Sequence, residues 1–406
     1  MTESQTSRTL RESADVVVLG AGPAGLVLGV LLHTAGIDCV ILERASRTHV
    51  QTRARAGFLA PNTVRILDRH GLADGLHRHG HRHGTCEFRT EDGRFRLDYG
   101  ALGQGGQHHV YPQQNLVTDL LNHYLGLGGR IRFRTEALGV RDTDGSRPAV
   151  TTREPDGSPG RWTARYVAGC DGRYGAARRS LPPDAVRHHR YDHGVTWLGL
   201  LAETPASLDA VGYAIHGHGF AGHMARTSEV TRYYLQWQRG ASADAWSEQR
   251  IWDELDVRMR AADHGPLRRG RLLERGVFDL TCDVVEPLRH GPLFLAGDAA
   301  SLLAPAAAKG ANLAVLEAEI LAEALADALT RGDTAGLDSY SDRCLAHIWR
   351  AQEFTGWMTR LLHAPPPDRD QGGGSFFHAA LQRSRLASLR TSRVHQDWFA
   401  ENYVGV

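Results

Sequence analysis

The sequence has few of the features that hold together a small secreted domain or anchor a chain in a membrane. Its 5 cysteines are odd in number, scattered, and never in C-x-x-C spacing. This argues against a disulfide framework or a zinc site and is typical of a reducing cytoplasm. No apolar run reaches the roughly 18–20 residues of a membrane span, and the polar start "MTESQTSRTLRESAD" has no signal-peptide core. We therefore expect a cytoplasmic protein that does not bind membranes.

An excess of charge of either sign is also missing. The formal net charge is +1, so no overall field would attract nucleic acid. Histidine is plentiful, and the run "HRHGHRHG" at 77–84 is typical of a metal-binding tract. It has no carboxylate or thiolate partner within it, however, and we expect no metal site. The 42% hydrophobic and 23% charged residues are typical of a globular protein.

The first informative unit is "DVVVLGAGPAGLVLGVLLHTAGIDCVILER", residues 15–44. A short β-branched strand is followed by Gly20, Gly22 and Gly25, an apolar helix and a second buried strand that ends at Glu43. The glycines allow a tight turn and a close approach of the backbone to a pyrophosphate, while the acidic residue reaches a ribose hydroxyl. A tight strand–helix turn without a ligand is the alternative. The complete unit predicts dinucleotide binding.

Alternation of strands and helices returns after a stretch of alternating, aromatic-rich runs at 190–240. We therefore predict an α/β fold (α+β overall): a Rossmann-like nucleotide-binding domain with an inserted antiparallel β-sheet domain and a helical C-terminal region. Local patterns predict one strand over 130–140, a hairpin over 141–165, helices over 249–263, 310–330 and 338–363, and a loop over 364–374. The predicted boundaries are 1–75, 100–185 and 280–345 for the nucleotide-binding domain, 76–99 and 186–279 for the inserted sheet, and 346–406 for the helical region.

Three stretches carry a family resemblance: "GAGPAG" at 20–25, "CDG" at 170–172 and "GDAASLLAP" at 297–305. The last alone could be the alanine-rich start of a helix. Together the three resemble the single-component flavoprotein aromatic hydroxylases. The resemblance implies that the first stretch binds the FAD pyrophosphate and that Asp171 of the second serves FAD and nicotinamide. It also implies that Asp298 contacts the ribityl and pyrophosphate part and that the following loop faces the isoalloxazine.

A wider resemblance covers residues 13–406. The segments "RARAGFLAPNTVRIL", "YDHGVTWLGLLAETP", "TRYYLQ", "AAAKGANLA" and "AENYVGV" are similar to the para-hydroxybenzoate hydroxylase family. The resemblance implies a set of FAD-binding residues, and the helix that starts near Gly310 would stabilise negative charge on the reduced flavin. The set is Gly20, Gly22, Gly25, Glu43, Arg44, Arg53, Arg55, Gln113, Asp171, Arg232, Asp298, Pro305, Gly310, Ala311 and Asn312.

The same resemblance implies a proton relay. Tyr213 would bond the substrate phenol, Tyr403 would follow it, and His83 would pass the proton to solvent. A phenolate attacks a flavin C4a-hydroperoxide more readily than a phenol does, and a buried tyrosine chain can ionise the phenol only if a group that titrates near neutral pH takes the proton. Each of these side chains alone is more typical of a core or surface residue.

The resemblance places the substrate between Tyr234, Met224, Arg226, the Pro305 carbonyl and Ala306. Arg226 would pair with a carboxylate, which implies an aromatic acid. Two positions depart from the family pattern. Met224 stands where the family has a serine that also binds the carboxylate, and Ala306-Ala307 stands in place of Thr-Gly. A buried charge-assisted hydrogen bond contributes roughly 1.5–3 kcal/mol, so the pocket differs at its acid end.

The implied activity is an FAD-dependent monooxygenase that uses NAD(P)H and O2. Through the C4a-hydroperoxide it would hydroxylate a para-hydroxy or para-amino benzoate-type acid ortho to the activating group. The substrate would be 4-hydroxybenzoate or a substituted relative such as 3-amino-4-hydroxybenzoate. The alternatives are a flavin oxidoreductase of the same fold acting on another phenolic compound, a halogenase, for which no W-x-W-x-I-P segment is present, and a non-catalytic flavin-binding protein.

The coenzyme side also departs from the family. The family has a histidine and an arginine that bind the NADPH phosphates, and this sequence has Tyr174 and Thr281 at those two positions. Arg44 is a candidate ligand for a 2′-phosphate, so NADPH is favoured and NADH stays open. With no second G-x-G-x-x-G motif, we expect the nicotinamide to visit transiently. The resemblance also suggests a homodimer.

Overall fold

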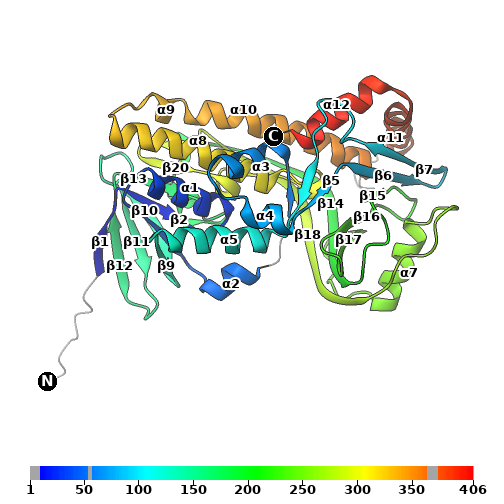
Figure 1. The fold of residues 1–406 in the computed structure, drawn as a ribbon, viewed down its shortest axis with the longest axis horizontal. Helices are drawn as coiled ribbons and strands as arrows, with labels where there is room; N and C mark the ends of the chain where they lie inside the picture. Colours follow the sequence, from blue (N-terminus) through cyan, green and yellow to red (C-terminus); the bar gives the residue numbers. More distant parts are fainter. Residues whose placement is uncertain (1–9, 54–56, 364–373, 406) are drawn as a thin grey trace.

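The computed structural model describes residues 10–53, 57–363 and 374–405. The chain forms two lobes, with a mainly parallel sheet and its helices in one lobe and a long, mainly antiparallel sheet in the other (Figure 1). A layer of C-terminal helices lies over the junction between the lobes. The predicted α/β fold class, with a Rossmann-like part and an antiparallel sheet, is confirmed.

The nucleotide-binding lobe is built on a sheet in the order β19-β20-β13-β2-β3-β9. All of its pairings are parallel except that of β19 with β20. β2 is buried and apolar along its whole length, as is typical of a parallel strand covered on both faces. The strands are β2 (Val16–Leu19), β3 (Cys39–Glu43), β9 (Arg130–Phe133), β13 (Tyr166–Gly169), β19 (Arg289–His290) and β20 (Leu293–Leu295). The main helices are α1 (Pro23–Thr34), α5 (Gln113–Gly126), α8 (Gly310–Thr330) and α10 (Tyr340–Leu362).

The strand predicted over 130–140 is wrong in one respect, because the segment forms two strands in different sheets. β9 ends at Phe133, and Arg134 then takes a left-handed backbone conformation with φ of 58°. A non-glycine residue in that region redirects the chain. After this turn β10 (Glu136–Arg141) joins β11 (Ala149–Arg153), β12 (Pro159–Thr163) and β1 (Leu10–Ser13) in a separate sheet. β11 and β12 form the predicted hairpin.

The second lobe is a sheet in the order β21-β18-β14-β17-β16-β15-β6-β7. One face packs on α7 (Glu248–Arg258), which ends earlier than the predicted helix over 249–263. The strict alternation of burial along β17 indicates that both faces of the sheet carry distinct side-chain layers. The strands are β6 (Thr85–Thr90), β7 (Gly93–Asp98), β14 (Arg187–Glu203), β15 (Val211–Ala214), β16 (Ala221–Ala225), β17 (Val230–Trp237), β18 (Arg271–Glu286) and β21 (Ser301–Leu302).

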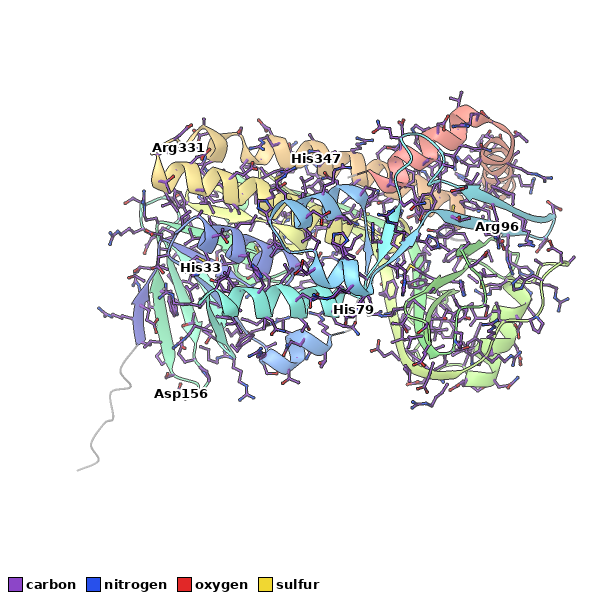
Figure 2. The ribbon with its side chains drawn as sticks, in the orientation of Figure 1. His33, His79, Arg96, Asp156, Arg331 and His347 are labelled. Atoms are coloured by element: carbon purple, nitrogen blue, oxygen red, sulfur yellow. The ribbon has the colours of Figure 1, made fainter. Side chains whose placement is uncertain are left out.

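The hairpin β6–β7 comes from the segment predicted to lie in the inserted domain, and β6 pairs with β15. A buried carboxylate holds it. Glu87 is fully buried and accepts hydrogen bonds from Arg89 at 2.6 Å and from Arg94 and Arg96 at 2.7 Å. Figure 2 labels Arg96, which lies on β7 of this hairpin opposite Glu87. The long strand β18 extends past the predicted boundary at 279/280 and pairs with β21 near the nucleotide-binding lobe.

The last helices bring the C-terminus back to the junction. α11 (Gly374–Thr391) and α12 (Arg393–Val404) lie beside α10 (Figure 1). The loop predicted over 364–374 lies, up to residue 373, outside the described residues. Within the described ranges, no helix is both long enough and apolar enough to cross a bilayer. Shorter elements are α2 (Arg47–Thr52), α3 (Pro61–Arg69), α4 (Asp74–His79), α6 (Ala176–Arg179), α9 (Ala335–Asp338), β4 (Phe58–Leu59), β5 (His81–His83) and β8 (His108–Val110).

Candidate active site

The glycine turn after β2 is shaped by close backbone packing at two of its three glycines. Gly20 has φ of +97°, and a Cβ there would lie 2.5 Å from the Cys170 carbonyl oxygen. A Cβ at Gly25 would lie 2.0 Å from the Gly20 carbonyl oxygen. Gly22, the N-cap of α1, has nothing within 4 Å of its Cβ position. The open space at Gly22, at a helix N-terminus, fits the close approach of a pyrophosphate.

Glu43 closes this turn from the end of β3. Its Oε2 accepts a hydrogen bond from the Ala21 amide at 2.8 Å, and its Oε1 accepts one from the Ala45 amide at 2.7 Å. The carboxylate therefore lies directly against the glycine turn, where a ribose hydroxyl would be bound. Arg44 and Arg53, predicted to contact phosphates, are exposed nearby. Arg55 lies outside the described residues.

The loop after β20 is tied to α8 by a buried hydrogen bond. The Gly297 amide donates to Glu317 Oε2 at 2.6 Å, and burial raises the pKa of Glu317 to about 8. Asp298 follows in a single turn (η2, Gly297–Ala299), and a second turn (η3, Pro305–Ala307) leads to Ala308 with φ of 53°. These turns place the predicted residues Pro305 and Ala306 just before the start of α8.

Asn312, predicted to bind the flavin, has its side-chain amide engaged by the protein. The oxygen accepts from the Ala60 amide at 2.8 Å and from Thr63 Oγ1 at 2.7 Å, while the nitrogen donates to the Phe58 and Ala308 carbonyls. The side chain therefore joins the start of α8 to the segment before α3. A contact from this residue to a cofactor would come from its backbone.

Three of the predicted site residues, Tyr213, Met224 and Tyr234, share one face of the second lobe's sheet. Tyr213 on β15 pairs with Gly222 on β16, and Gly222 pairs with Tyr234 on β17. Directly opposed residues lie on the same face. Met224 is two residues beyond Gly222 and pairs with Arg232, so both lie on that face as well. The side chains of Tyr213, Ala306 and Tyr403 are buried in one apolar cluster, against which Met224 and Tyr234 pack.

Tyr213 and Tyr403 form the centre of the site. Their hydroxyl oxygens lie 2.6 Å apart, and both side chains are buried. Burial raises the pKa of both phenols, because a phenolate would be poorly solvated there. Two neutral hydroxyls in such contact can pass protons along the pair without a charge on either ring, provided that each gives up its own proton as it receives another.

The third predicted relay member, His83, hydrogen-bonds to Tyr99. Its Nδ1 lies 2.9 Å from the Tyr99 hydroxyl. The Tyr99 ring also packs edge-on against Tyr403, with ring centroids 4.9 Å apart, and His108 packs against Tyr403 at 5.1 Å. The sequence did not point to Tyr99 or His108, because neither lies in a motif and their neighbours come from distant segments.

The predicted carboxylate ligand Arg226 is a buried residue just beyond β16, with a relative exposure of 6%. Its Nη2 donates to Gln114 Oε1 at 2.5 Å. Burial and the nearby charge of Arg232 lower the pKa of Arg226. A buried guanidinium of this kind can pair with the carboxylate of an anionic ligand.

Sequence reasoning also missed the role of Lys309. This lysine is 2% exposed at the N-terminus of α8, and its Nζ donates to the backbone carbonyls of Tyr403, at 2.8 Å, and Gly405. Burial lowers its pKa to about 7. These hydrogen bonds from Lys309 hold the C-terminal segment in the position in which the Tyr403 hydroxyl contacts the Tyr213 hydroxyl. The signal was present as one lysine inside the small-residue segment "AAAKGANLA".

Arg173 contacts both Thr281 and Tyr174, the two positions predicted to face the nicotinamide coenzyme. Arg173 Nη1 donates to Thr281 Oγ1 at 3.0 Å, and its guanidinium lies 5.4 Å from the centre of the Tyr174 ring. Tyr174 is 76% exposed. Asp171, of the same turn, accepts from the Ala177 amide at 3.1 Å and so caps α6. One arginine thus contacts both positions although the expected histidine and arginine are absent, and its Nε lies 3.6 Å from Asp283 Oδ2.

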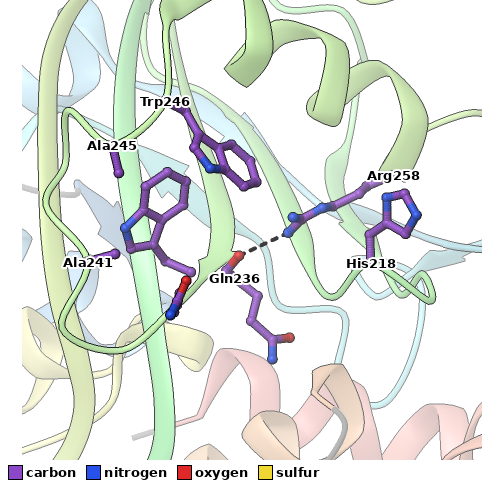
Figure 3. Close-up of a pocket in the computed structure, with 8 residues that line it drawn as sticks. His218, Gln236, Ala241, Ala245, Trp246 and Arg258 are labelled. Atoms are coloured by element: carbon purple, nitrogen blue, oxygen red, sulfur yellow. Dashed lines mark hydrogen bonds between the residues drawn. The ribbon is translucent and has the colours of Figure 1, made fainter.

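Two further regions lie apart from this site. A pocket of about 290 Å³ is lined by His218, Gln236, Ala241, Ala245, Trp246 and Arg258 (Figure 3), none of which was predicted as a site residue. In the histidine-rich tract, His77 pairs with Asp68 at 2.5 Å, and His79 points outward (Figure 2). Among the described residues, no three His, Cys, Asp or Glu side chains are grouped as metal ligands would be.

A glycine-turn nucleotide lobe joined to a sheet with a buried tyrosine pair defines a dinucleotide-dependent enzyme. Comparison with known proteins identifies the dinucleotide. Residues 13–355 match the protein family described as "FAD binding domain". The chain is 36% identical to the p-hydroxybenzoate hydroxylase of Acinetobacter baylyi, over 96% of this chain and 95% of that protein. The protein belongs to the para-hydroxybenzoate hydroxylase family of FAD-dependent aromatic hydroxylases.

Two other relatives mark the breadth of this group. A 3-amino-4-hydroxybenzoate 2-monooxygenase of Streptomyces cremeus is 26% identical over 88% of this chain and 90% of that protein. The crystal structure of p-nitrophenol 4-monooxygenase from Pseudomonas putida DLL-E4 has a TM-score of 0.81 at 20% identity, covering 98% of this chain and 99% of that one. The latter likeness shows the shared fold.

Proposed function

We propose that the protein is a monooxygenase that uses NAD(P)H and O2 to hydroxylate a para-hydroxy or para-amino benzoate-type acid ortho to its activating group. The observation that carries this proposal is the buried Tyr213–Tyr403 pair over the sheet face that carries Tyr234, together with the buried Arg226, whose charge lies near Arg232 and Tyr234 of that face. One end of the site can ionise a phenol, and the other can bind a carboxylate. The name of the 36% identical relative supports the same substrate class.

At the phenol end, Tyr213 is the residue that would bond the substrate hydroxyl. Its own hydroxyl is already in contact with Tyr403. When the substrate phenol gives its proton to Tyr213, the proton of Tyr213 can pass to Tyr403 while Tyr403 gives its own proton onward, so that neither buried ring becomes charged. The substrate is then held as a phenolate, whose ortho carbon is more nucleophilic.

At the acid end, Arg226 would pair with the substrate carboxylate, with Tyr234 beside it. Met224 lies two residues before Arg226 on the same face and donates no hydrogen bond. The site therefore has fewer polar contacts for the acid group than the family pattern provides. We propose either 4-hydroxybenzoate or a substituted relative such as 3-amino-4-hydroxybenzoate as the substrate, a class that two differently named relatives also represent.

The chain's residues fit FAD. The open position at Gly22 and the carboxylate of Glu43 against the turn would hold its pyrophosphate and ribose, and the loop from Asp298 to the start of α8 would face the ring. Bound FAD supplies the two-electron redox chemistry and the reaction with O2. Arg173 adds positive charge beside Tyr174 and Thr281, which favours the phosphates of a visiting nicotinamide coenzyme. The cytoplasmic location, the homodimer and the domain boundaries remain predictions.

The test is a coupled assay on the purified holoenzyme. NADPH and NADH oxidation would be followed with 4-hydroxybenzoate, 3-amino-4-hydroxybenzoate and 4-aminobenzoate, with mass detection of products. We expect at least one acid to stimulate coenzyme oxidation and to yield a product heavier by one oxygen. Coenzyme oxidation that none of the three acids stimulates, with no oxygenated product, would contradict the proposal.

A further inference from the structure

The hydroxyl of Tyr99 lies at the centre of a cluster formed by three distant segments. It follows β7, while His83 lies on β5 and His108 on β8. The Tyr99 hydroxyl is 2.8 Å from the His83 carbonyl oxygen, 2.9 Å from His83 Nδ1 and 3.3 Å from His108 Nδ1. The Tyr99 side chain is fully buried, and its ring packs edge-on against Tyr403. Tyr99 therefore contacts both Tyr403 and His83, which are neighbours in the predicted proton relay.

These contacts determine where the proton of the His83 ring lies. A carbonyl oxygen can only accept, so the single hydroxyl proton of Tyr99 is donated to the His83 carbonyl. The hydroxyl oxygen then accepts from His83 Nδ1, which must carry a hydrogen. In the neutral ring Nε2 is consequently the unprotonated nitrogen. Because Nδ1–H is a donor in both the neutral and the charged ring, this bond survives when the ring takes up a second proton.

We propose that Tyr99 is a positioning residue for proton transfer, which holds His83 in the tautomer whose Nε2 receives the proton that leaves Tyr403. The inference rests on the proposed phenol-ionising function. The substrate proton passes to Tyr213, the Tyr213 proton to Tyr403, and the Tyr403 proton to Nε2 of His83. The resulting imidazolium then releases a proton to solvent, since His83 is half-buried.

The surroundings of His83 suit a group that releases its proton readily. Burial lowers its pKa, and the Asp209 carboxylate opposes that effect. The other groups that face the cluster are His108, whose pKa burial and Lys309 both lower, and the neutral phenols of Tyr99 and Tyr403. The Tyr99 hydroxyl orients the imidazole but carries no charge. Unlike a carboxylate, it therefore does not stabilise the imidazolium form of His83 and does not raise its pKa.

The test uses Tyr99→Phe, which keeps the ring that packs on Tyr403 and removes only the hydroxyl. Holoenzyme would be mixed rapidly with 4-hydroxybenzoate or 3-amino-4-hydroxybenzoate, and the absorbance of the bound phenolate would be followed from pH 6 to pH 10. At pH 7 we expect phenol ionisation to be slower by roughly 10-fold, less than the loss of a proton-transfer group itself. Near pH 10, where a free phenol ionises in water, the variant should match the wild type.

A double-variant cycle separates positioning from a general structural role. If Tyr99 acts through His83, Tyr99→Phe combined with His83→Asn should ionise the substrate no more slowly than His83→Asn alone. Tyr124→Phe, a buried tyrosine whose hydroxyl contacts Cys39 in the other lobe, is the matched control and should behave as wild type. FAD content should be equal in all variants.

The outcomes are distinct. Wild-type ionisation rates in Tyr99→Phe at pH 7, slow ionisation that persists at pH 10, or additive losses in the double variant would each overturn the role of Tyr99 while leaving the enzyme's activity intact. Wild-type enzyme that ionises neither acid would overturn the proposed function, and the positioning role with it.

Discussion

The hydroxyl oxygens of Tyr213 and Tyr403 lie 2.6 Å apart although 190 residues separate them in the chain. Tyr213 is fixed by the sheet through β15, and Tyr403 is held in place by α12 and by the hydrogen bond from Lys309 to its carbonyl. The pair therefore exists only when both lobes and the C-terminal helices are assembled. Proton transfer from the substrate depends on this assembly.

Removing one hydroxyl of the pair should slow hydroxylation near neutral pH. For Tyr403→Phe we expect a loss of roughly 10²–10⁴-fold at pH 7, because the substrate phenol can no longer pass its proton onward. The loss should shrink toward pH 10, where the free substrate is already ionised. Tyr233→Phe is the control, since this buried tyrosine bonds Ser207 on the opposite face of the sheet. Equal turnover of Tyr403→Phe and wild type at pH 7 would refute the relay.

Arg226→Ala should impair binding of the aromatic acid and leave FAD in place. Loss of a charge-assisted hydrogen bond contributing about 1.5–3 kcal/mol corresponds to a rise in KM of roughly 10- to 150-fold. The measurement is steady-state kinetics together with the flavin absorbance of the purified protein. Arg271→Ala removes an exposed arginine at the start of β18 and should change neither value. If Arg226→Ala lost FAD instead, Arg226 would belong to the cofactor site.

Met224→Ser restores a hydroxyl two residues before Arg226. If the carboxylate lies between these side chains, the Kd for unsubstituted 4-hydroxybenzoate should fall by roughly 10-fold or more, as expected for one added hydrogen bond to a charged group. Met224→Leu keeps the volume without the hydroxyl and should leave the Kd close to that of wild type. A weaker complex with Met224→Ser would mean that Met224 contacts an apolar part of the substrate.

The glycine turn allows a matched pair of substitutions. Gly22→Ala meets nothing within 4 Å of its new Cβ, whereas Gly25→Ala would place Cβ 2.0 Å from the Gly20 carbonyl oxygen. We expect Gly22→Ala to fold with wild-type thermal stability after FAD removal and to bind FAD weakly, because the pyrophosphate needs that space. Gly25→Ala should lower the stability of the apoprotein itself. Full FAD affinity in Gly22→Ala would show that the cofactor does not approach this residue.

Lys309 should give the protein a measurable dependence of stability on pH. Its pKa is about 7 in the folded chain, below the usual 10.5, because of burial. Between these values the unfolded chain binds the proton that the folded chain has released. Stability therefore rises with pH through this window, by at most about 1.4 kcal/mol per pH unit.

Urea unfolding of wild type and Lys309→Met at pH 7 and pH 9 measures this effect. The variant loses hydrogen bonds to the Tyr403 and Gly405 carbonyls at every pH, so the informative quantity is the change in the difference between the two proteins. We expect wild type to gain stability relative to Lys309→Met as pH rises. Parallel pH profiles would show that Lys309 does not titrate in this range.

The sequence predicted the parts of the site that depend on local chain geometry. Gly20 and Gly25 belong to a turn whose spacing alone requires glycine, and Glu43 ends the next strand, so their proximity follows from the order of elements. The strand predicted over 130–140 divides at Arg134, which has a left-handed backbone conformation. The sequence did not predict this break, because the residue there is neither glycine nor asparagine.

The remaining contacts depend on distant packing that no local pattern contains. Tyr99, Gln114 and Lys309 reach the site through their positions beside a hairpin, at the start of α5 and at the start of α8. His83 was predicted as a relay member through family resemblance, but its partner Tyr99 depends on how β5, β7 and β8 meet. Such partners become visible only when the whole chain is folded.

The most direct test of the central claim is oxygen incorporation from isotope-labelled O2. Holoenzyme with NADPH or NADH would be given 4-hydroxybenzoate and 3-amino-4-hydroxybenzoate under labelled O2, and the products would be analysed by mass spectrometry. We predict a product that carries one labelled oxygen on the ring carbon ortho to the activating group. Coenzyme consumption with unlabelled product, or with both acids returned unchanged, would contradict the assignment of this site to hydroxylation of an aromatic acid.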